Sequence, residues 1–135
     1  MNFTQTQITK ILDEIEYTNK VTLAVGDNRI HNTAGILSLK DLLNLIRNSQ
    51  MMISNDSGPM HLAFALGTTT IGLFGPCNPI HYNIPDSAII FYKQILCSPC
   101  VHNSLRAPCK GNNRCMKEIC VEEVFEKALI LLESV

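Results

Sequence analysis

The segment 51–67, MMISNDSGPMHLAFALG, most strongly limits how this chain folds. It opens with a short apolar run, which is typical of a buried strand in a parallel sheet. Polar residues then break the run, and Pro59 suits the first position of a helix because its missing N–H would have no helical partner there. Gly67 suits the position just past a helix end. The segment therefore predicts a strand, a tight loop and a short helix.

Helix-like and strand-like stretches alternate along the rest of the chain. Apolar residues at helical spacing predict a helix over 4–18, where Thr4 and Gln7 suit a capping box, and a second helix after Ser38, which suits a box with Asp41. The buried stripe of that second helix would be Leu39, Leu42, Leu43 and Ile46. Further strands are predicted at 21–25, 68–74 and 87–92, then a Cys-rich loop over 97–120 and a final helix over 121–134. This alternation predicts an α/β fold with a parallel sheet. Because the first predicted element is a helix, we expect the first strand of the domain to be missing.

Composition limits the possible functions. A chain of 135 residues with 46% hydrophobic and 17% charged residues is sufficient for one compact domain. The net charge is −1, from 11 Lys and Arg against 12 Asp and Glu, which argues against a nucleic-acid partner. No apolar run approaches the roughly 20 residues that span a bilayer. The N-terminus does not resemble a signal peptide, so we expect a cytoplasmic protein.

The loop at 54–61 has the residues of an anion site. Free N–H groups of Ser57, Gly58 and Met60 at a helix N-terminus would attract phosphate oxygens, aided by the helix dipole. The sequence also predicts that Gly58 permits a tight turn and a close approach of backbone to ligand. Asp56 would repel a phosphate that it faced, but its carboxylate suits the hydroxyls of a sugar. His61 lies one turn into the helix, where it would donate to a phosphate or hold the loop. Together these residues predict a sugar bound through a diphosphate.

Two structural interpretations remain open for these residues. Asp56 is also a common N-cap residue, and a cap needs no ligand. His61 taken alone is more often a structural histidine whose nitrogens bond within the protein. The pattern lacks a P-loop and a full dinucleotide-binding fingerprint, so the strand, loop and helix alone do not identify a ligand.

The stretch 55–79, NDSGPMHLAFALGTTTIGLFGPCNP, resembles the signature of glycosyltransferase family 9, the ADP-heptose:lipopolysaccharide heptosyltransferases. Cys77 stands where this family usually has threonine. The upstream stretch 32–46 and the cysteine-bearing tail also look like segments of the family. The resemblance covers residues from about 20 to 135.

The resemblance implies a GT-B architecture, in which residues 1–135 form most of the C-terminal, Rossmann-like three-layer domain that binds the nucleotide-sugar. Ser57 and Gly58 would contact the diphosphate of an ADP-heptose-type compound, Asp56 the transferred sugar, and His61 the region near the diphosphate. A further group would lie near the adenine, namely Asn32, Thr33, Ala34 and Gly35. No cofactor is implied.

The same resemblance places the general base and the lipopolysaccharide core acceptor on an N-terminal domain, which this sequence does not contain. The chain would thus be the sugar-donor-binding part of an inverting bacterial enzyme peripheral to the inner membrane, inactive alone and without a catalytic residue of its own. A different class of function also fits, namely a non-catalytic nucleotide-binding or interaction fragment.

Five of the six cysteines lie between Cys97 and Cys120. The spacing Cys97-x2-Cys100-x8-Cys109-x5-Cys115 suits tetrahedral zinc, with His102 as a substitute ligand, and would make the chain a small zinc-binding module. A redox-active C-x-x-C pair is a second interpretation. Reduced or opportunistically paired thiols that pack a long loop are the third interpretation, under which no metal is bound. Cys77 and Cys120 are expected to be ordinary small apolar residues.

Overall fold

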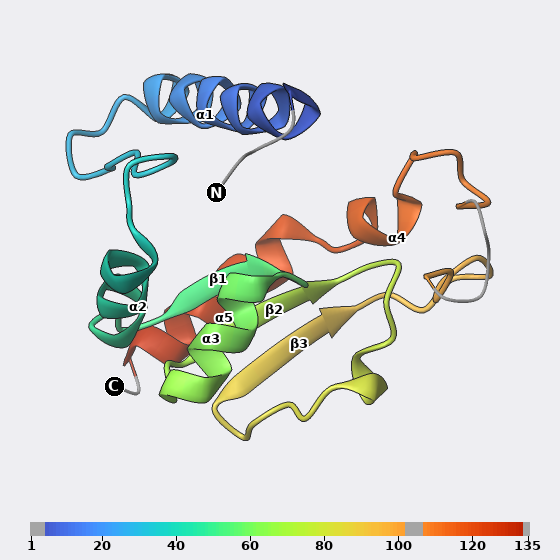
Figure 1. The fold of residues 1–135 in the computed structure, drawn as a ribbon. Helices are drawn as coiled ribbons and strands as arrows, with labels where there is room; N and C mark the ends of the chain where they lie inside the picture. Colours follow the sequence, from blue (N-terminus) through green and yellow to red (C-terminus); the bar gives the residue numbers. More distant parts are fainter. Residues whose placement is uncertain (1–4, 102–106, 134–135) are drawn as a thin grey trace. The chain divides into compact units, whose positions relative to one another are not determined.

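The structure is a computed structural model that describes residues 5–101 and 107–133, with side chains described from Glu14 onward. The chain divides into two compact units, one ending at Leu42 and one beginning at Leu43. Its elements in chain order are α1 (Gln5–Val25), α2 (Leu39–Arg47), β1 (Met52–Asn55), α3 (Gly58–Leu66), β2 (Thr70–Phe74), the 3-10 helix η1 (Pro79–His81), β3 (Ala88–Tyr92), α4 (Arg114–Lys117) and α5 (Val121–Glu133) (Figure 1). Three residues used in sequence predictions lie outside the described residues. They are Thr4 of the first capping box, His102 as a substitute zinc ligand, and Ser134 at the end of the final helix.

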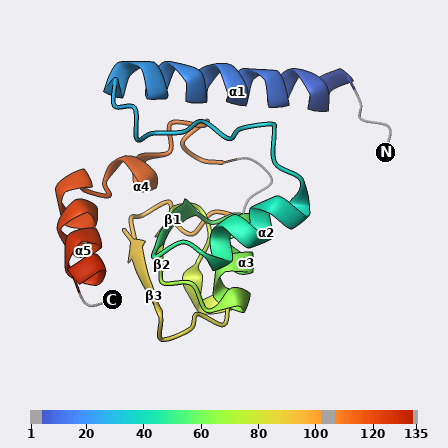
Figure 2. The same cartoon turned by 90° about the vertical axis from the view of Figure 1, so that its left-hand side faces the viewer.

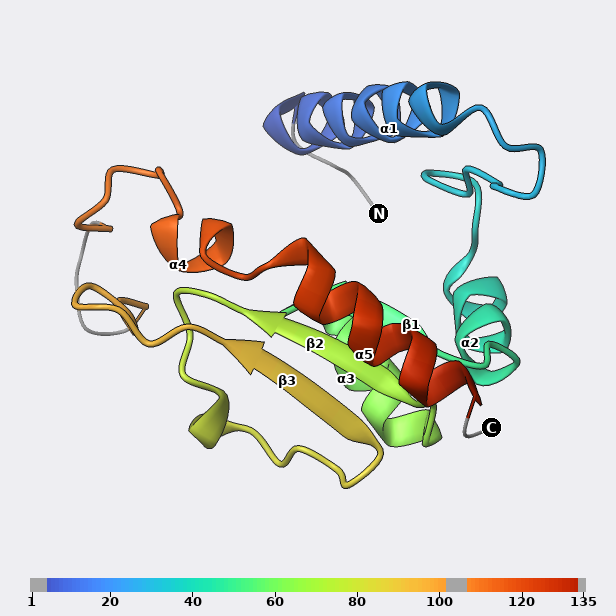
Figure 3. The same cartoon turned by 180° about the vertical axis from the view of Figure 1, so that it is seen from behind.

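The second unit is built on a parallel sheet. Its strands lie in the order β1-β2-β3, and Ile71 in the central strand pairs with Ile53 on one side and with Ile89 on the other. Helix α3 covers one face of this sheet and α5 lies over the other, as the views in Figures 1, 2 and 3 agree. The predicted three-layer α/β fold is therefore confirmed, as are the strands predicted near 51–54, 68–74 and 87–92.

The core of the second unit lies between α3 and β2. Met60 and Ala63 of α3 are fully buried, as are Ile71 and Phe74 of β2. Gly72 lets the helix come close, because a Cβ at this position would lie 3.2 Å from the Sδ atom of Met60. Strand β2, predicted at 68–74, is thus buried on both faces, which is usual for the middle of a parallel sheet. The strand predicted at 51–54 is less buried than expected, since Ile53 of β1 is 48% exposed.

Two helix ends follow the predicted signals. Gly67 ends α3 in the left-handed conformation with φ +72°, and the N–H of Thr68 donates to the carbonyl of Ala63 at 3.0 Å. Ser38 and Asp41 form the predicted capping box before α2: the Asp41 N–H donates to Ser38 Oγ at 3.2 Å, and the Ser38 N–H donates to Asp41 Oδ2 at 3.3 Å. These local signals depend only on neighbouring residues, so they can be predicted without knowledge of the fold.

The predicted strand at 21–25 is wrong, because this segment continues α1 to Val25. The Gly26 N–H donates to the carbonyl of Thr22 at 3.2 Å, and Leu23 is 80% exposed. No glycine or proline interrupts residues 5–25, so nothing local stops the helix before Gly26. Although α1 is long, neither it nor any other helix in the described part of the chain is apolar enough to cross a membrane.

The apolar helix faces are less buried than their patterns suggest. In α2 the predicted buried stripe is wrong at Leu39, which is 66% exposed, whereas Ile46 is buried. In α5 Ala128 is buried but Phe125 is 61% exposed. The predicted loop over 97–120 also contains the short helix α4.

Thr68 offers a test of the connection between α2 and β2. Its buried hydroxyl donates to the carbonyl of Ile46 at 3.0 Å. Thr68→Val keeps the side-chain shape but leaves that carbonyl without this donor, so we expect the free energy of unfolding to fall by about 1–2 kcal/mol in urea denaturation. Thr69→Val is the matched control, because the Thr69 hydroxyl has no hydrogen bond among the described residues. Equal losses in both variants would contradict the prediction.

Candidate ligand-binding site

Polar groups gather where β1 and β2 end. Asp56 directly follows β1, and the segment 75–77 follows β2. A cavity of about 280 Å³ lies here, lined by Asn55, Asp56, Leu73, Gly75, Pro76, Cys77, Asn113 and Met116. The carboxyl ends of parallel strands are the usual ligand-binding edge of an open α/β sheet. The cavity is therefore the candidate ligand site of the second unit.

The short helix α4 helps to close this cavity. It contributes Met116, whose Sδ atom would lie 2.6 Å from a Cβ placed on Gly75. Gly75 is buried, so the absence of a side chain there lets α4 pack against the end of β2. The cysteine-bearing segment thus forms one wall of the site.

The N-terminus of α3 presents two amides beside the cavity. Ser57 is extended, with φ −156° and ψ 164°, and no side chain caps the helix. The N–H groups of Ser57 and Gly58 have no hydrogen-bond partner among the described residues. Gly58 is exposed, and a Cβ built on it would meet nothing within 4 Å. A ligand can therefore approach these amides directly.

One sequence expectation about this loop is wrong. The N–H of Met60 does not point outward, because it donates to the carbonyl of Ser57 at 3.1 Å in the first turn of the helix, and the side chain belongs to the core. Gly58 does not adopt a positive φ, so a left-handed conformation is not the reason for glycine there. The site keeps the amides of Ser57 and Gly58 but not that of Met60.

The Ser57 hydroxyl is held by a neighbouring serine. Its Oγ lies 3.1 Å from Ser54 Oγ, which in turn donates to the carbonyl of Asn55 at 2.9 Å. Ser57 occupies the N-cap position of α3, so Asp56 is not the cap. The interpretation of Asp56 as a simple N-cap is therefore wrong.

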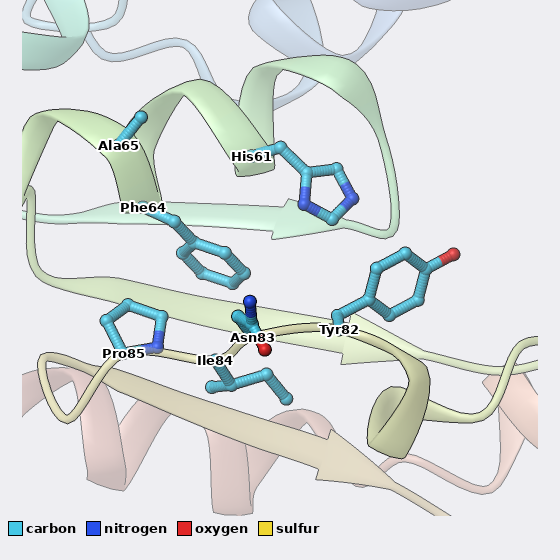
Figure 4. A pocket seen from close by; sticks show the side chains of 7 residues that line it. All are labelled: His61, Phe64, Ala65, Tyr82, Asn83, Ile84 and Pro85. Atoms are coloured by element: carbon cyan, nitrogen blue, oxygen red, sulfur yellow. The ribbon is translucent and has the colours of Figure 1, made fainter.

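Instead, the Asp56 carboxylate contacts two side chains. Tyr82 Oη donates to Asp56 Oδ2 at 3.3 Å, and His61 Nε2 lies 3.5 Å from Asp56 Oδ1. The Asp56 side chain is 19% exposed and that of His61 is 40% exposed. The His61 and Tyr82 rings lie side by side with centroids 4.9 Å apart and planes tilted by 42° (Figure 4). One carboxylate thus has a separate partner for each of its oxygens.

Sequence reasoning missed Tyr82 and Cys77 as parts of this site. Burial, followed by hydrogen bonding to Asp56, raises the pKa of the Cys77 thiol. A hydrogen bond with Cys77, then burial and the charge of Asp56, raise the pKa of Tyr82 to about 12. Both groups therefore stay protonated at neutral pH. The only sequence signal was that their loop follows a strand, since Tyr82 lies 26 residues from Asp56.

The predicted adenine-contacting residues, Asn32, Thr33, Ala34 and Gly35, lie in the first unit. Asn32 is engaged within that unit: its Oδ1 accepts the Ala34 N–H at 3.0 Å, and its Nδ2 donates to Asn19 Oδ1 at 2.6 Å. Gly35 has φ +77°, which favours glycine at this turn. The structure thus shows how this turn is built.

All six cysteines are free thiols. Within residues 5–101 and 107–133, no group of three or more His, Cys, Asp or Glu side chains is arranged to hold a metal ion. Burial raises the pKa of Cys115, whereas backbone N–H groups of Asn113 and Gly111 lower that of Cys109. Cys100 and Cys115 are buried, as expected for thiols that pack the loop.

Comparison with known proteins agrees with the fold. Residues 12–110 match the family described as glycosyltransferase family 9 (heptosyltransferase). This match covers most of the chain, and the chain belongs to that family. The resemblance predicted from the 55–79 stretch is therefore confirmed, and the parallel sheet with helices on both faces is consistent with one Rossmann-like half of a GT-B enzyme.

Individual relatives give the same result. The chain is 30% identical over 109 residues to lipooligosaccharide heptosyltransferase 2 of Campylobacter jejuni. This aligned region covers 78% of this chain and 33% of the relative. It is 37% identical over 84 residues to the lipopolysaccharide core heptosyltransferase OpsX of Haemophilus influenzae, covering 60% of this chain and 24% of the relative. The chain thus spans a third or less of the length of these relatives. No solved structure matches it significantly.

Proposed function

We propose that this chain is the sugar-donor-binding part of a family 9 glycosyltransferase of lipopolysaccharide core synthesis, and that it holds an ADP-heptose-type nucleotide-sugar by its diphosphate. The observation that carries the proposal is a pair of amides, Ser57 and Gly58, at the start of α3 beside the Asp56 cavity, which have no hydrogen-bond partner in the described part of the chain. The relatives named above are heptosyltransferases, which supports this class of ligand.

The start of α3 suits a diphosphate for two physical reasons. The N–H groups of Ser57 and Gly58 are available as hydrogen-bond donors, and the helix dipole adds about half a positive charge at this end. The open space above Gly58 lets phosphate oxygens reach the backbone. In an inverting transfer, the same groups would stabilise the charge that develops on the departing diphosphate.

Asp56 suits the sugar rather than the phosphates. An ionised carboxylate has about four lone-pair positions, and Tyr82 and His61 each contact one oxygen. The remaining positions can accept hydrogen bonds from sugar hydroxyls. In this proposal the residues of the second unit bind the sugar donor, while the general base and the acceptor site lie outside this chain, so that the chain alone is inactive.

Calorimetric titration of the purified chain with ADP, ADP-heptose and a UDP-sugar tests the proposal. We expect binding of the ADP compounds and a loss of affinity of at least about tenfold in Gly58→Val, because the added methyl groups occupy the space that phosphate oxygens need. Urea unfolding of this variant is measured alongside binding, because Gly58 begins α3 directly before Pro59, where a side chain is disfavoured in the helical conformation.

Gly58→Ala is the matched control, and its smaller side chain should weaken binding less than valine does. Wild-type affinity in Gly58→Val, or no binding of ADP compounds by the wild-type chain, would contradict the proposal. Equal binding of ADP and UDP compounds would leave the diphosphate site but remove the preference for adenine.

A further inference from the structure

Tyr82 stands where a compact turn meets the candidate site. It directly follows η1, and its N–H donates to the carbonyl of Pro79 at 3.0 Å. Asn78 caps the start of η1, because its Oδ1 accepts the N–H of Ile80 at 3.1 Å. The backbone that carries Tyr82 is therefore fixed by hydrogen bonds on both sides of the turn.

The ring of Tyr82 is fixed as well. It packs against His61 with ring centroids 4.9 Å apart, and against the fully buried Phe74 at 5.7 Å. It also lines a second cavity of about 480 Å³, together with His61, Phe64, Ala65, Asn83, Ile84 and Pro85. Figure 4 shows the ring at one end of this cavity, with its hydroxyl pointing away from Phe64. The ring contacts thus place the hydroxyl beside Asp56 and Cys77, and it contacts both.

The two contacts to Asp56 act on different oxygens. Tyr82 Oη reaches Oδ2, whereas His61 Nε2 lies near Oδ1. With one contact alone, the carboxylate could still rotate about its Cβ–Cγ bond. Two contacts on separate oxygens define its orientation. Because the pKa of Tyr82 is raised to about 12, the phenol keeps its proton at neutral pH and remains a donor.

We propose that Tyr82 is a positioning residue, whose hydroxyl orients the Asp56 carboxylate for hydrogen bonds with the hydroxyls of the donor sugar. The proposal rests on the proposed function, and it adds a residue that acts on the sugar and not on the nucleotide. Tyr82 makes no hydrogen bond with the amides of Ser57 and Gly58 among the described residues, so its hydroxyl should matter only for ligands that have the sugar.

Tyr82→Phe separates this role from a structural one, because phenylalanine keeps the ring contacts and loses only the hydroxyl. We expect the affinity of the full chain for ADP to stay within about twofold, and its affinity for ADP-heptose to fall by about tenfold, as for one hydrogen bond to a charged group. Tyr92→Phe is the matched control, since the Tyr92 hydroxyl contacts Ser98 and not Asp56. It should change neither affinity.

Asp56→Asn tests the same contact from the other side. If Tyr82 acts through Asp56, Tyr82→Phe should have no further effect on ADP-heptose affinity in the Asp56→Asn background, whereas a structural role would give additive losses. Urea unfolding of each variant checks that the chain is folded. If Tyr82→Phe does not fold, Asp56→Asn still reports on the contact between Tyr82 and Asp56.

The possible results separate the two proposals. Binding of neither ligand by the wild-type chain would overturn the proposed function and this inference with it. Binding of ADP and ADP-heptose with equal affinity would overturn the inference alone, as would a Tyr82→Phe variant that loses affinity for both ligands equally or for neither.

Discussion

Replacing Met60 with alanine is expected to lower the free energy of unfolding by about 3 kcal/mol, the largest stability change predicted for this chain. Met60 belongs to α3, and its side chain is fully buried against β2, where Gly72 leaves room for its sulfur. Truncation removes apolar contacts and leaves a cavity in a close-packed region, which costs about 2–5 kcal/mol for methionine to alanine. Urea denaturation with one chain concentration for all variants measures the change.

Leu96→Ala is the control for that experiment. Leu96 is a large apolar residue of the same unit that lies exposed on the surface, so its truncation should change the free energy of unfolding by less than about 0.5 kcal/mol. A loss below about 1 kcal/mol for Met60→Ala would show that α3 does not pack on the sheet as described.

The second large effect concerns proton binding. Tyr82 should titrate near pH 12 and not near the usual 10, which means that the folded chain holds this proton about a hundredfold more tightly. The ultraviolet absorbance of the phenolate, taken as the difference between the wild-type chain and Tyr82→Phe, separates this titration from those of Tyr17 and Tyr92. A midpoint near pH 10 in the folded protein would contradict the prediction.

The direction of the pH effect follows from the raised pKa. The folded state binds the proton more tightly than the unfolded state, so the stabilisation is complete below about pH 10 and is lost as the pH rises towards about 12. The hydrogen bond with Cys77 is the largest cause of the shift, so Cys77→Ala should move the midpoint back towards the ordinary value.

Sequence alone predicted the parts of the molecule that depend on local signals. The strand, loop and helix of 51–67 form as predicted, since Pro59, Gly67 and the apolar periodicity act within a few residues. The loop that carries Asp56 lies at the carboxyl edge of the sheet for the same reason. The family resemblance also rested on this contiguous stretch, so it needed no tertiary information.

The incorrect predictions concern features that local patterns do not determine. A run of β-branched and apolar residues at 21–25 becomes a strand only where a sheet edge accepts it; otherwise uninterrupted helix propensity extends α1. The Met60 amide depended on the exact closure of the first helical turn. Tyr82 could not be found because its contact with Asp56 joins loops after two different strands.

The backbone at Gly58 has a practical consequence for experiments. Apart from the two chain neighbours, nothing lies within 4 Å of a Cβ at this position, so a larger side chain would meet an incoming anion before it met the rest of the protein. A series of alanine, valine and leucine at this one position would therefore measure the free distance above the backbone. The side-chain size at which affinity for the diphosphate disappears would give the distance between the polypeptide and the bound phosphate.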